Sequence, residues 1–145
     1  MSSVQRYRPD SAQQLAELEA SATPHPWSGR HYQDSLDAGH LFFQLLPANT
    51  GVAVVMPVLD EAELLNIFIA AQHQGQGLGR QLLSGTMASL RATGCQRLFL
   101  EVRTSNHAAR KLYQHCGFIE SGLRKNYYPA ANGQREDAIL MEAML

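Results

Sequence analysis

Cysteine is scarce in this 145-residue chain, and neither sign of charge predominates. Cys95 and Cys116 are its two cysteines; they form no CxxC pair and no set of four zinc ligands, so we expect neither a disulfide framework nor a metal site. Twelve Lys and Arg against thirteen Asp and Glu give a formal net charge of −1. No overall field favours nucleic acid or an anionic membrane, and we expect neither as a partner.

Long apolar runs are also lacking. The first ten residues, MSSVQRYRPD, contain no apolar stretch like that of a secretory signal, and the longest apolar-rich run, residues 64–71, is far shorter than a membrane span. A cytoplasmic location is therefore expected. The chain is 45% hydrophobic and 17% charged, which excludes a disordered tail. At this length we predict a single domain over residues 1–145, and a monomer.

The spacing of apolar residues predicts a mixed α/β fold. Two short helices come first, the first with Asp10 or Ser11 as N-cap and the second with Ser28. A Trp27–Tyr32 staple supports the second helix, and Gly39 ends it. Three strands with short spacers then predict antiparallel pairing, and afterwards helix and strand alternate. The predicted strands are residues 41–46, 52–58, 62–69, 97–102, 118–124 and 137–145, and the later helices are 78–93 and 105–115.

Two details of the second half of the chain are also predicted. The helix over 105–115 is expected to bury Ala108, Ala109 and Leu112 and to end at Gly117 in a Schellman motif. The segment KNYYPAANGQ, residues 125–134, is rich in turn formers, so we predict a loop there.

A glycine-rich segment, QGQGLGR at residues 74–80, lies between an apolar strand and an amphipathic helix. Glycines at this point allow a tight turn and let a ligand approach the amides of a helix N-terminus, where the dipole favours an anion. No Gly-Lys-Ser/Thr follows, and the spacing does not match a dinucleotide fingerprint. The glycines alone fit a phosphate site and a flexible turn about equally well.

The motif from Gln74 to Gly79 resembles the Q/R-x-x-G-x-G/A pattern of the GNAT superfamily of acyl-CoA-dependent N-acyltransferases. The run LEVRTSNHAARKLYQHCGF, residues 100–118, is similar to that family's strand followed by N-x-A-A-x-x-L-Y-x-x-x-G-F. RKNYYPAANGQREDAILM, residues 124–141, resembles more narrowly the RimI-type enzymes, which acetylate the N-terminal alanine of a small-subunit ribosomal protein. The resemblance implies the GNAT fold, a mixed sheet with helices on both faces, and acetyl-CoA as co-substrate.

Transfer of an acetyl group from a thioester to an amine needs a base for the amine and an acid for the thiolate. Glu101 lies in the strand run LFLEV, where alternation places it with Phe99 on one face; Tyr113 lies on the following helix. By themselves, a glutamate facing solvent and a tyrosine at the core edge explain both residues. The resemblance implies that Glu101 is the general base and Tyr113 the general acid.

The resemblance also assigns binding residues. For the acyl-CoA it implies a bulged strand, the glycine-rich segment and an asparagine that also suits a helix cap: Ile67, Phe68, Ile69, Gly75, Gln76, Gly77, Leu78, Gly79, Arg80 and Asn106. For the acceptor peptide it implies Tyr127, Tyr128, Glu136 and Asp137, which also fit turn residues and a solvated acidic edge. Three features depart from the RimI pattern: Ala70-Ala71, Gly75 in place of arginine, and the additional Gln134.

The leading hypothesis is therefore acetylation of a protein N-terminus, with a ribosomal protein as the partner. An α-amine, with a pKa of about 7.7 to 8.0, is an easier substrate than lysine at about 10.4. Two alternatives stay open: a GNAT enzyme acting on other N-termini, lysines or a small amine, and a module that binds acyl-CoA or a partner without turnover. The presence of both Glu101 and Tyr113 argues against the second alternative.

Overall fold

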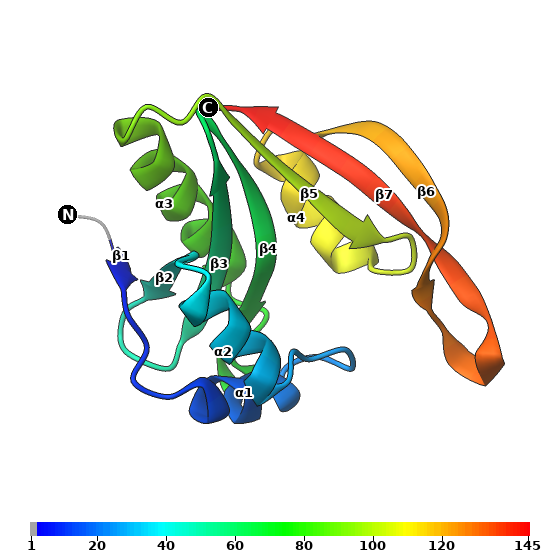
Figure 1. Ribbon diagram of the computed structural model, residues 1–145, viewed down its shortest axis with the longest axis horizontal. Helices are drawn as coiled ribbons and strands as arrows, with labels where there is room; N and C mark the ends of the chain where they lie inside the picture. Colours follow the sequence, from blue (N-terminus) through cyan, green and yellow to red (C-terminus); the bar gives the residue numbers. More distant parts are fainter. Residues whose placement is uncertain (1–2) are drawn as a thin grey trace.

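Seven strands form one mixed sheet in the computed structural model, which describes residues 3–145 (Figure 1). The strands are β1 (Val4–Tyr7), β2 (Leu41–Leu45), β3 (Gly51–Val58), β4 (Glu61–Ile69), β5 (Arg97–Arg103), β6 (Ile119–Pro129) and β7 (Arg135–Met144). Their order is β1-β2-β3-β4-β5-β7-β6. Every neighbouring pair is antiparallel except β4–β5, which is parallel. The predicted mixed α/β class with antiparallel N-terminal strands is confirmed.

Helices cover both faces of this sheet. α1 (Ala12–Ala20) and α2 (Gly29–Asp37) pack on one face, where Leu15 and Tyr32 meet Phe42. α3 (Leu78–Ala92) and α4 (His107–His115) contribute to the other core, where Leu82 meets Phe43. Adjacent residues of β2 thus point into different cores, as the period of two in a strand requires.

The caps predicted from the sequence are present. The Ser11 side chain accepts a hydrogen bond from the Gln14 amide, and Ser28 accepts one from the His31 amide. At the end of α4, the Phe118 amide donates to the Tyr113 carbonyl at 3.0 Å, and Gly117 has a φ of +92°. These elements depend on local sequence, which is why their bounds were predictable to within a residue or two.

Three features differ from the predictions. β1 was not expected; with four residues it is held by its ladder to β2. The loop predicted over 125–134 is wrong for its first half, because β6 continues to Pro129 through a register shift at which Asn126 has a φ of +52°. Burial of Ala108 is also wrong, because its side chain is exposed and lines the cleft. Ala109 and Leu112 are half-buried: both pack against the core and also border the cleft.

The cleft opens where β4 and β5 separate. Their pairing covers three residue pairs and ends at Glu63↔Phe99, while β5 stays paired with β7 up to Arg103↔Ala138. A bulge in β4 lies at the same level: Val55 faces Leu64 and Val54 faces Asn66, so that Leu65 has no partner on β3. Bulges bend a strand and interrupt its pairing. The two strands therefore diverge, as the ribbons of β4 and β5 show in Figure 1.

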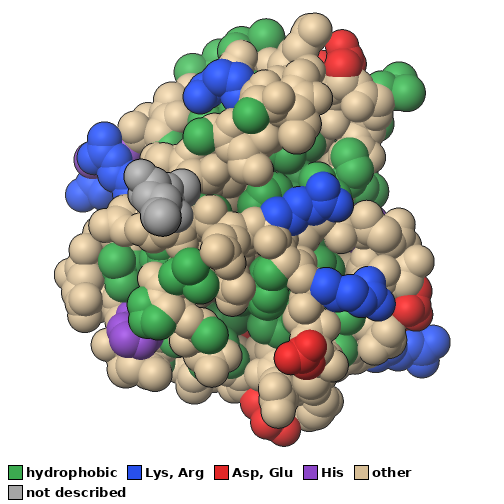
Figure 2. Space-filling view, turned by 90° about the vertical axis from the view of Figure 1, so that its left-hand side faces the viewer, with side chains coloured by type: hydrophobic (Ala, Val, Ile, Leu, Met, Phe, Trp, Pro, Cys, Tyr) green, Lys and Arg blue, Asp and Glu red, His purple; other side chains and the backbone are tan. Residues whose placement is uncertain are grey.

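The surface agrees with the balanced charge. Figure 2 shows basic and acidic side chains interspersed on the face that it presents. None of the helices within residues 3–145 is long and apolar enough to cross a membrane.

Candidate active site

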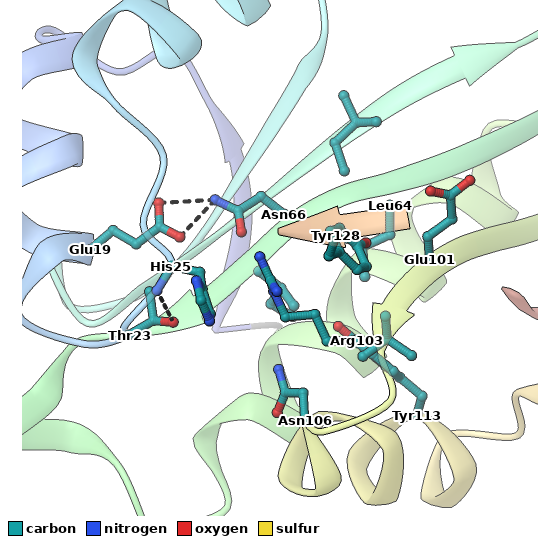
Figure 3. A pocket seen from close by; sticks show the side chains of 13 residues that line it. Glu19, Thr23, His25, Leu64, Asn66, Glu101, Arg103, Asn106, Tyr113 and Tyr128 are labelled. Carbon is teal, nitrogen blue, oxygen red and sulfur yellow. Dashed lines mark hydrogen bonds between the residues drawn. The ribbon is translucent and has the colours of Figure 1, made fainter. Parts of the chain in front are cut away.

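The cleft has two halves. They meet at Tyr113 and Asn106, because each of these two residues lines both halves. The carboxylate half lies between the diverging strands and is lined by Glu19, Asn66, Glu101 and Tyr128, among others (Figure 3). The glycine-loop half runs along the N-terminus of α3 and the exposed side of α4. Chain segments far apart in the sequence thus form one continuous site.

Glu101 lies on β5 with its side chain 19% exposed, on the face opposite Leu100 and Val102. Its Oε1 forms an ion pair with Arg124 Nε at 3.1 Å. The Arg124 guanidinium also lies over the Tyr127 ring, 5.2 Å from the centroid. Glu63 of β4 belongs to the same cluster: burial and the charge of Glu101 raise the pKa of Glu63, while Arg124 lowers it. The arrangement is a partly buried carboxylate held by one cation.

Tyr113 lies on α4, 7% exposed, with its ring packed against Phe118 at 5.6 Å between centroids. Within residues 3–145 its hydroxyl has no hydrogen-bond partner and is not sealed from the cleft. Burial, and to a lesser degree Tyr128, raise the pKa of the Tyr113 phenol above its ordinary value. The group is therefore a protonated donor whose hydrogen is free for a bound molecule.

The glycine loop has the backbone that its sequence predicts. Gly75 and Gly77 have φ values of +78° and +76°, and a Cβ added at either would meet no atom within 4 Å, so both face open space. Gly77 is the N-cap of α3. Gln74 fixes the loop, because its Nε2 donates to the carbonyls of Ala22 and Ile69 at 3.0 Å. This is a helix N-terminus with accessible amides, suited to an anion.

The predicted cofactor residues gather in the glycine-loop half, with one exception. Gln76 is not among the lining residues, whereas the others are: Ile67, Phe68, Ile69, Gly75, Gly77, Leu78, Gly79, Arg80 and Asn106. Asn106 also caps α4, since its Oδ1 accepts from the Ala109 amide at 3.2 Å. Asn106 is therefore both a helix cap and a cleft residue.

The predicted acceptor residues are divided. Tyr128 lines the carboxylate half, under the Arg103 guanidinium at 4.5 Å, and burial with the charge of Glu101 raises the pKa of Tyr128 to about 12. Glu136 does not line it: it pairs with Arg103 at 2.9 Å and accepts from Thr104 and Ser105, contacts that lower the pKa of Glu136 to about 2.

The other two acceptor residues also lie outside the lining. Asp137 accepts a hydrogen bond from the Asn126 amide at 2.8 Å, which stabilises the irregular part of β6. Tyr127 packs edge-on against Tyr128 at 5.0 Å. Contact of Tyr127, Glu136 and Asp137 with an acceptor stays a prediction.

One buried group of the cleft was missed. Glu19 of α1 is 2% exposed, and its carboxylate accepts hydrogen bonds from Tyr32, Asn66 and the Trp27 amide. Burial raises the pKa of Glu19, and these hydrogen bonds oppose the rise. A signal was present, because Glu19 stands four residues after Leu15 on the apolar side of its helix.

A carboxylate, a phenol and the N-terminus of a helix thus border one cleft, and transfer of an acyl group to an amine requires a base, an acid and a site for the donor. The model of the acetyltransferase (GNAT) family matches residues 12–118, and the chain belongs to this family. The [ribosomal protein bS18]-alanine N-acetyltransferase of Haemophilus influenzae is 40% identical over 147 residues, which cover 100% of both chains. These findings confirm the resemblance to GNAT and RimI-type enzymes and the expectation of an acetyltransferase.

Solved structures agree. The crystal structure of the ribosomal-protein-S18-alanine N-acetyltransferase from Escherichia coli matches with a TM-score of 0.88 at 38% identity, over 99% of this chain and 94% of that one. A GNAT family acetyltransferase from Elizabethkingia anophelis with acetyl-CoA bound matches with a TM-score of 0.76 at 25% identity, over 98% of this chain and 97% of that one.

Proposed function

We propose that this protein transfers the acetyl group of acetyl-CoA to the α-amine of an alanine-initiated protein, with ribosomal protein bS18 as the acceptor. The observation that carries the proposal is the single cleft in which Glu101, Tyr113 and the glycine loop meet. The relative from Haemophilus influenzae, similar over its whole length, supports the choice of acceptor.

Acetyl-CoA fits the glycine-loop half. Its pyrophosphate suits the amides at the N-terminus of α3, where Gly75 and Gly77 leave open space and Arg80 adds a positive charge. Beyond the bulge, β4 is free of β5, and Ile67, Phe68 and Ile69 line the cleft. In the proposed binding mode the thioester lies near Tyr113, which lines both halves of the cleft.

The chemistry follows from the two groups. Glu101 removes a proton from the ammonium group, directly or through water, and the amine nitrogen attacks the thioester carbon. A C–N bond forms, the C–S bond breaks, and the Tyr113 hydroxyl gives its proton to the leaving thiolate. The nitrogen then loses its second proton through water to the Tyr113 oxygen, which gives the neutral amide and restores the phenol. Arg124 contacts one oxygen of Glu101, which leaves Oε2 for the amine or the water.

The test is a panel of acceptors incubated with acetyl-CoA, read by thiol release and by mass spectrometry of the product. The panel contains an Ala-initiated basic hexapeptide, its acidic counterpart, a peptide with an internal lysine and a blocked N-terminus, and spermidine. We expect acetyl transfer to the α-amine of the Ala-initiated basic peptide. Preference for the blocked lysine peptide or for spermidine would overturn the choice of acceptor.

The role of Glu101 is tested with Glu101→Gln, which keeps the shape of the side chain and removes the base. We expect kcat to fall roughly 100-fold or more. Glu120→Gln is the matched control, because Glu120 is 51% exposed and pairs with Arg110 outside the residues that line the cleft. An equal loss in both variants would contradict a specific role of Glu101.

A further inference from the structure

A buried group of three side chains joins α1, α2 and β4 at the wall of the carboxylate half. The Tyr32 hydroxyl donates to Glu19 Oε1 at 2.5 Å. The Asn66 amide nitrogen donates to both oxygens of Glu19, at 3.0 and 3.1 Å, and lies 3.2 Å from the Tyr32 oxygen. Tyr32 is fully buried, whereas Glu19 and Asn66 line the cleft. The proposed reaction, with Glu101 as base and Tyr113 as acid, does not use these three side chains.

The carboxylate determines which way the Asn66 amide points. The hydrogen-bond partners of Glu19 in the described part of the chain are all donors: the Tyr32 hydroxyl, the Trp27 amide and the Asn66 amide nitrogen. A flipped amide would place Asn66 Oδ1 against the two carboxylate oxygens, acceptor against acceptor, which is unfavourable at a buried site. The nitrogen therefore faces Glu19 and the oxygen faces away from it.

The freed oxygen points into the cleft. Figure 3 shows Asn66 Oδ1 turned away from Glu19, toward the space that the cleft residues surround. Within residues 3–145 this oxygen has no hydrogen-bond partner, and it is not sealed from solvent. Asn66 follows the bulge of β4 and directly precedes Ile67, which lines both halves. A preoriented acceptor thus stands next to the junction at which transfer is proposed.

We infer that Asn66 Oδ1 accepts a hydrogen bond from an N–H group of the leading residues of the acceptor, and that Glu19 is a positioning residue that holds this amide in place. The inference rests on the proposed function. A peptide N-terminus presents N–H groups on its α-amine and on the following backbone amide, and no other chemistry is required of the ligand. The arrangement suits a chain end that enters between β4 and β5.

The test is a double-mutant cycle with Asn66→Ala and Glu19→Gln, assayed on the Ala-initiated basic peptide. Loss of one hydrogen bond of ordinary strength should lower kcat/KM for the peptide roughly three- to tenfold in Asn66→Ala. The KM for acetyl-CoA should stay unchanged. Glu19→Gln introduces a donor that competes for Oδ1, so it should lower kcat/KM for the peptide in the same direction.

The double variant separates positioning from a general structural effect. If Glu19 acts through Asn66, the double variant loses no more kcat/KM than Asn66→Ala alone. Multiplying losses would overturn the role of Glu19, because a merely structural residue acts independently of Asn66. Circular dichroism at the assay temperature verifies that each variant is folded, and Gln13→Ala, an exposed change on the same helix, serves as the control.

A methylated peptide identifies the donor. If the second backbone amide donates, N-methylation there lowers kcat/KM for the wild-type protein and adds no loss in Asn66→Ala. If methylation is without effect while Asn66→Ala is impaired, the α-amine is the donor. Unchanged peptide kinetics in Asn66→Ala would overturn the inference and leave the proposed function intact, whereas a wild-type protein that acetylates no Ala-initiated peptide would overturn both.

Discussion

Replacing Tyr113 with phenylalanine should separate catalysis from stability. The phenol borders both halves of the cleft, and its hydroxyl has no partner among residues 3–145. The ring packs on Phe118, and phenylalanine keeps that contact. The variant removes one proton donor and leaves the packing in place.

The magnitude follows from these contacts. A positioned general acid contributes about 10² to 10⁴ in rate, so we expect kcat to fall by about 100-fold, equivalent to about 2.7 kcal/mol. The free energy of unfolding should change by less than about 0.5 kcal/mol, since no hydrogen bond among residues 3–145 is lost. Because burial raises the pKa of Tyr113, the phenol stays protonated through an assay range of about pH 6 to 9, and this residue should add no alkaline limb to the wild-type profile.

The assay is steady-state thiol release at saturating acetyl-CoA, paired with urea unfolding followed by circular dichroism. Tyr7→Phe is the matched control: it removes a phenol hydroxyl from β1, outside the residues that line the cleft, and should keep full activity. An unchanged kcat in Tyr113→Phe would refute the general-acid assignment. The assignment would also be refuted if the loss of kcat were fully explained by a smaller fraction of folded protein.

Three further predictions concern the loop, an ion pair and the core. Gly77→Ala and Gly39→Ala should each cost about 1 kcal/mol of stability, because both glycines have positive φ and open surroundings, but only Gly77→Ala should raise the KM for acetyl-CoA. The pKa of Glu136, about 2 in the folded chain, lies below its ordinary 4.5, so its carboxylate stabilises the fold above about pH 4.5 and this contribution is lost as the pH falls toward 2. The melting temperature of Glu136→Gln should therefore lie below that of the wild type at pH 7 and approach it at pH 3; an equal gap at both would contradict the assignment. Leu82→Ala, at a fully buried position, should lower the free energy of unfolding by about 2 to 5 kcal/mol in urea titrations, and a loss under 1 kcal/mol would contradict its place in the core.

Local sequence was sufficient to predict those features that depend on contacts between residues close together in the chain. Ser11 and Ser28 cap their helices through contacts three residues away, and Gly77 turns the backbone at the start of α3. The alternation in β5 placed Glu101 opposite Leu100, as observed. The same signals carried the motifs by which the family was predicted, because these motifs lie in contiguous segments.

Long-range pairing explains where prediction failed. The turn-forming residues 125–134 predicted a loop, yet the ladder to β7 holds β6 extended to Pro129, and the Asn126 bulge accommodates the mismatch. The apolar side of α4 predicted burial for Ala108, but part of that side lines the cleft opened by the separation of β4 and β5. Secondary-structure propensity is a property of one segment, whereas strand pairing and the lining of a cleft depend on the other segments that pack against it.

The sequence by itself therefore determined the order of the elements after β1, the helix caps, the glycine loop and the candidates Glu101 and Tyr113. Only the tertiary structure decided that Glu136 is occupied by Arg103 and that Glu19 is joined to Asn66, 47 residues away. Contacts between elements distant in the chain leave no periodic signal, since each partner satisfies only its own local pattern. The bulge and the divergence of two strands place Glu19, Asn66 and Arg103 around one cleft, which no single segment specifies.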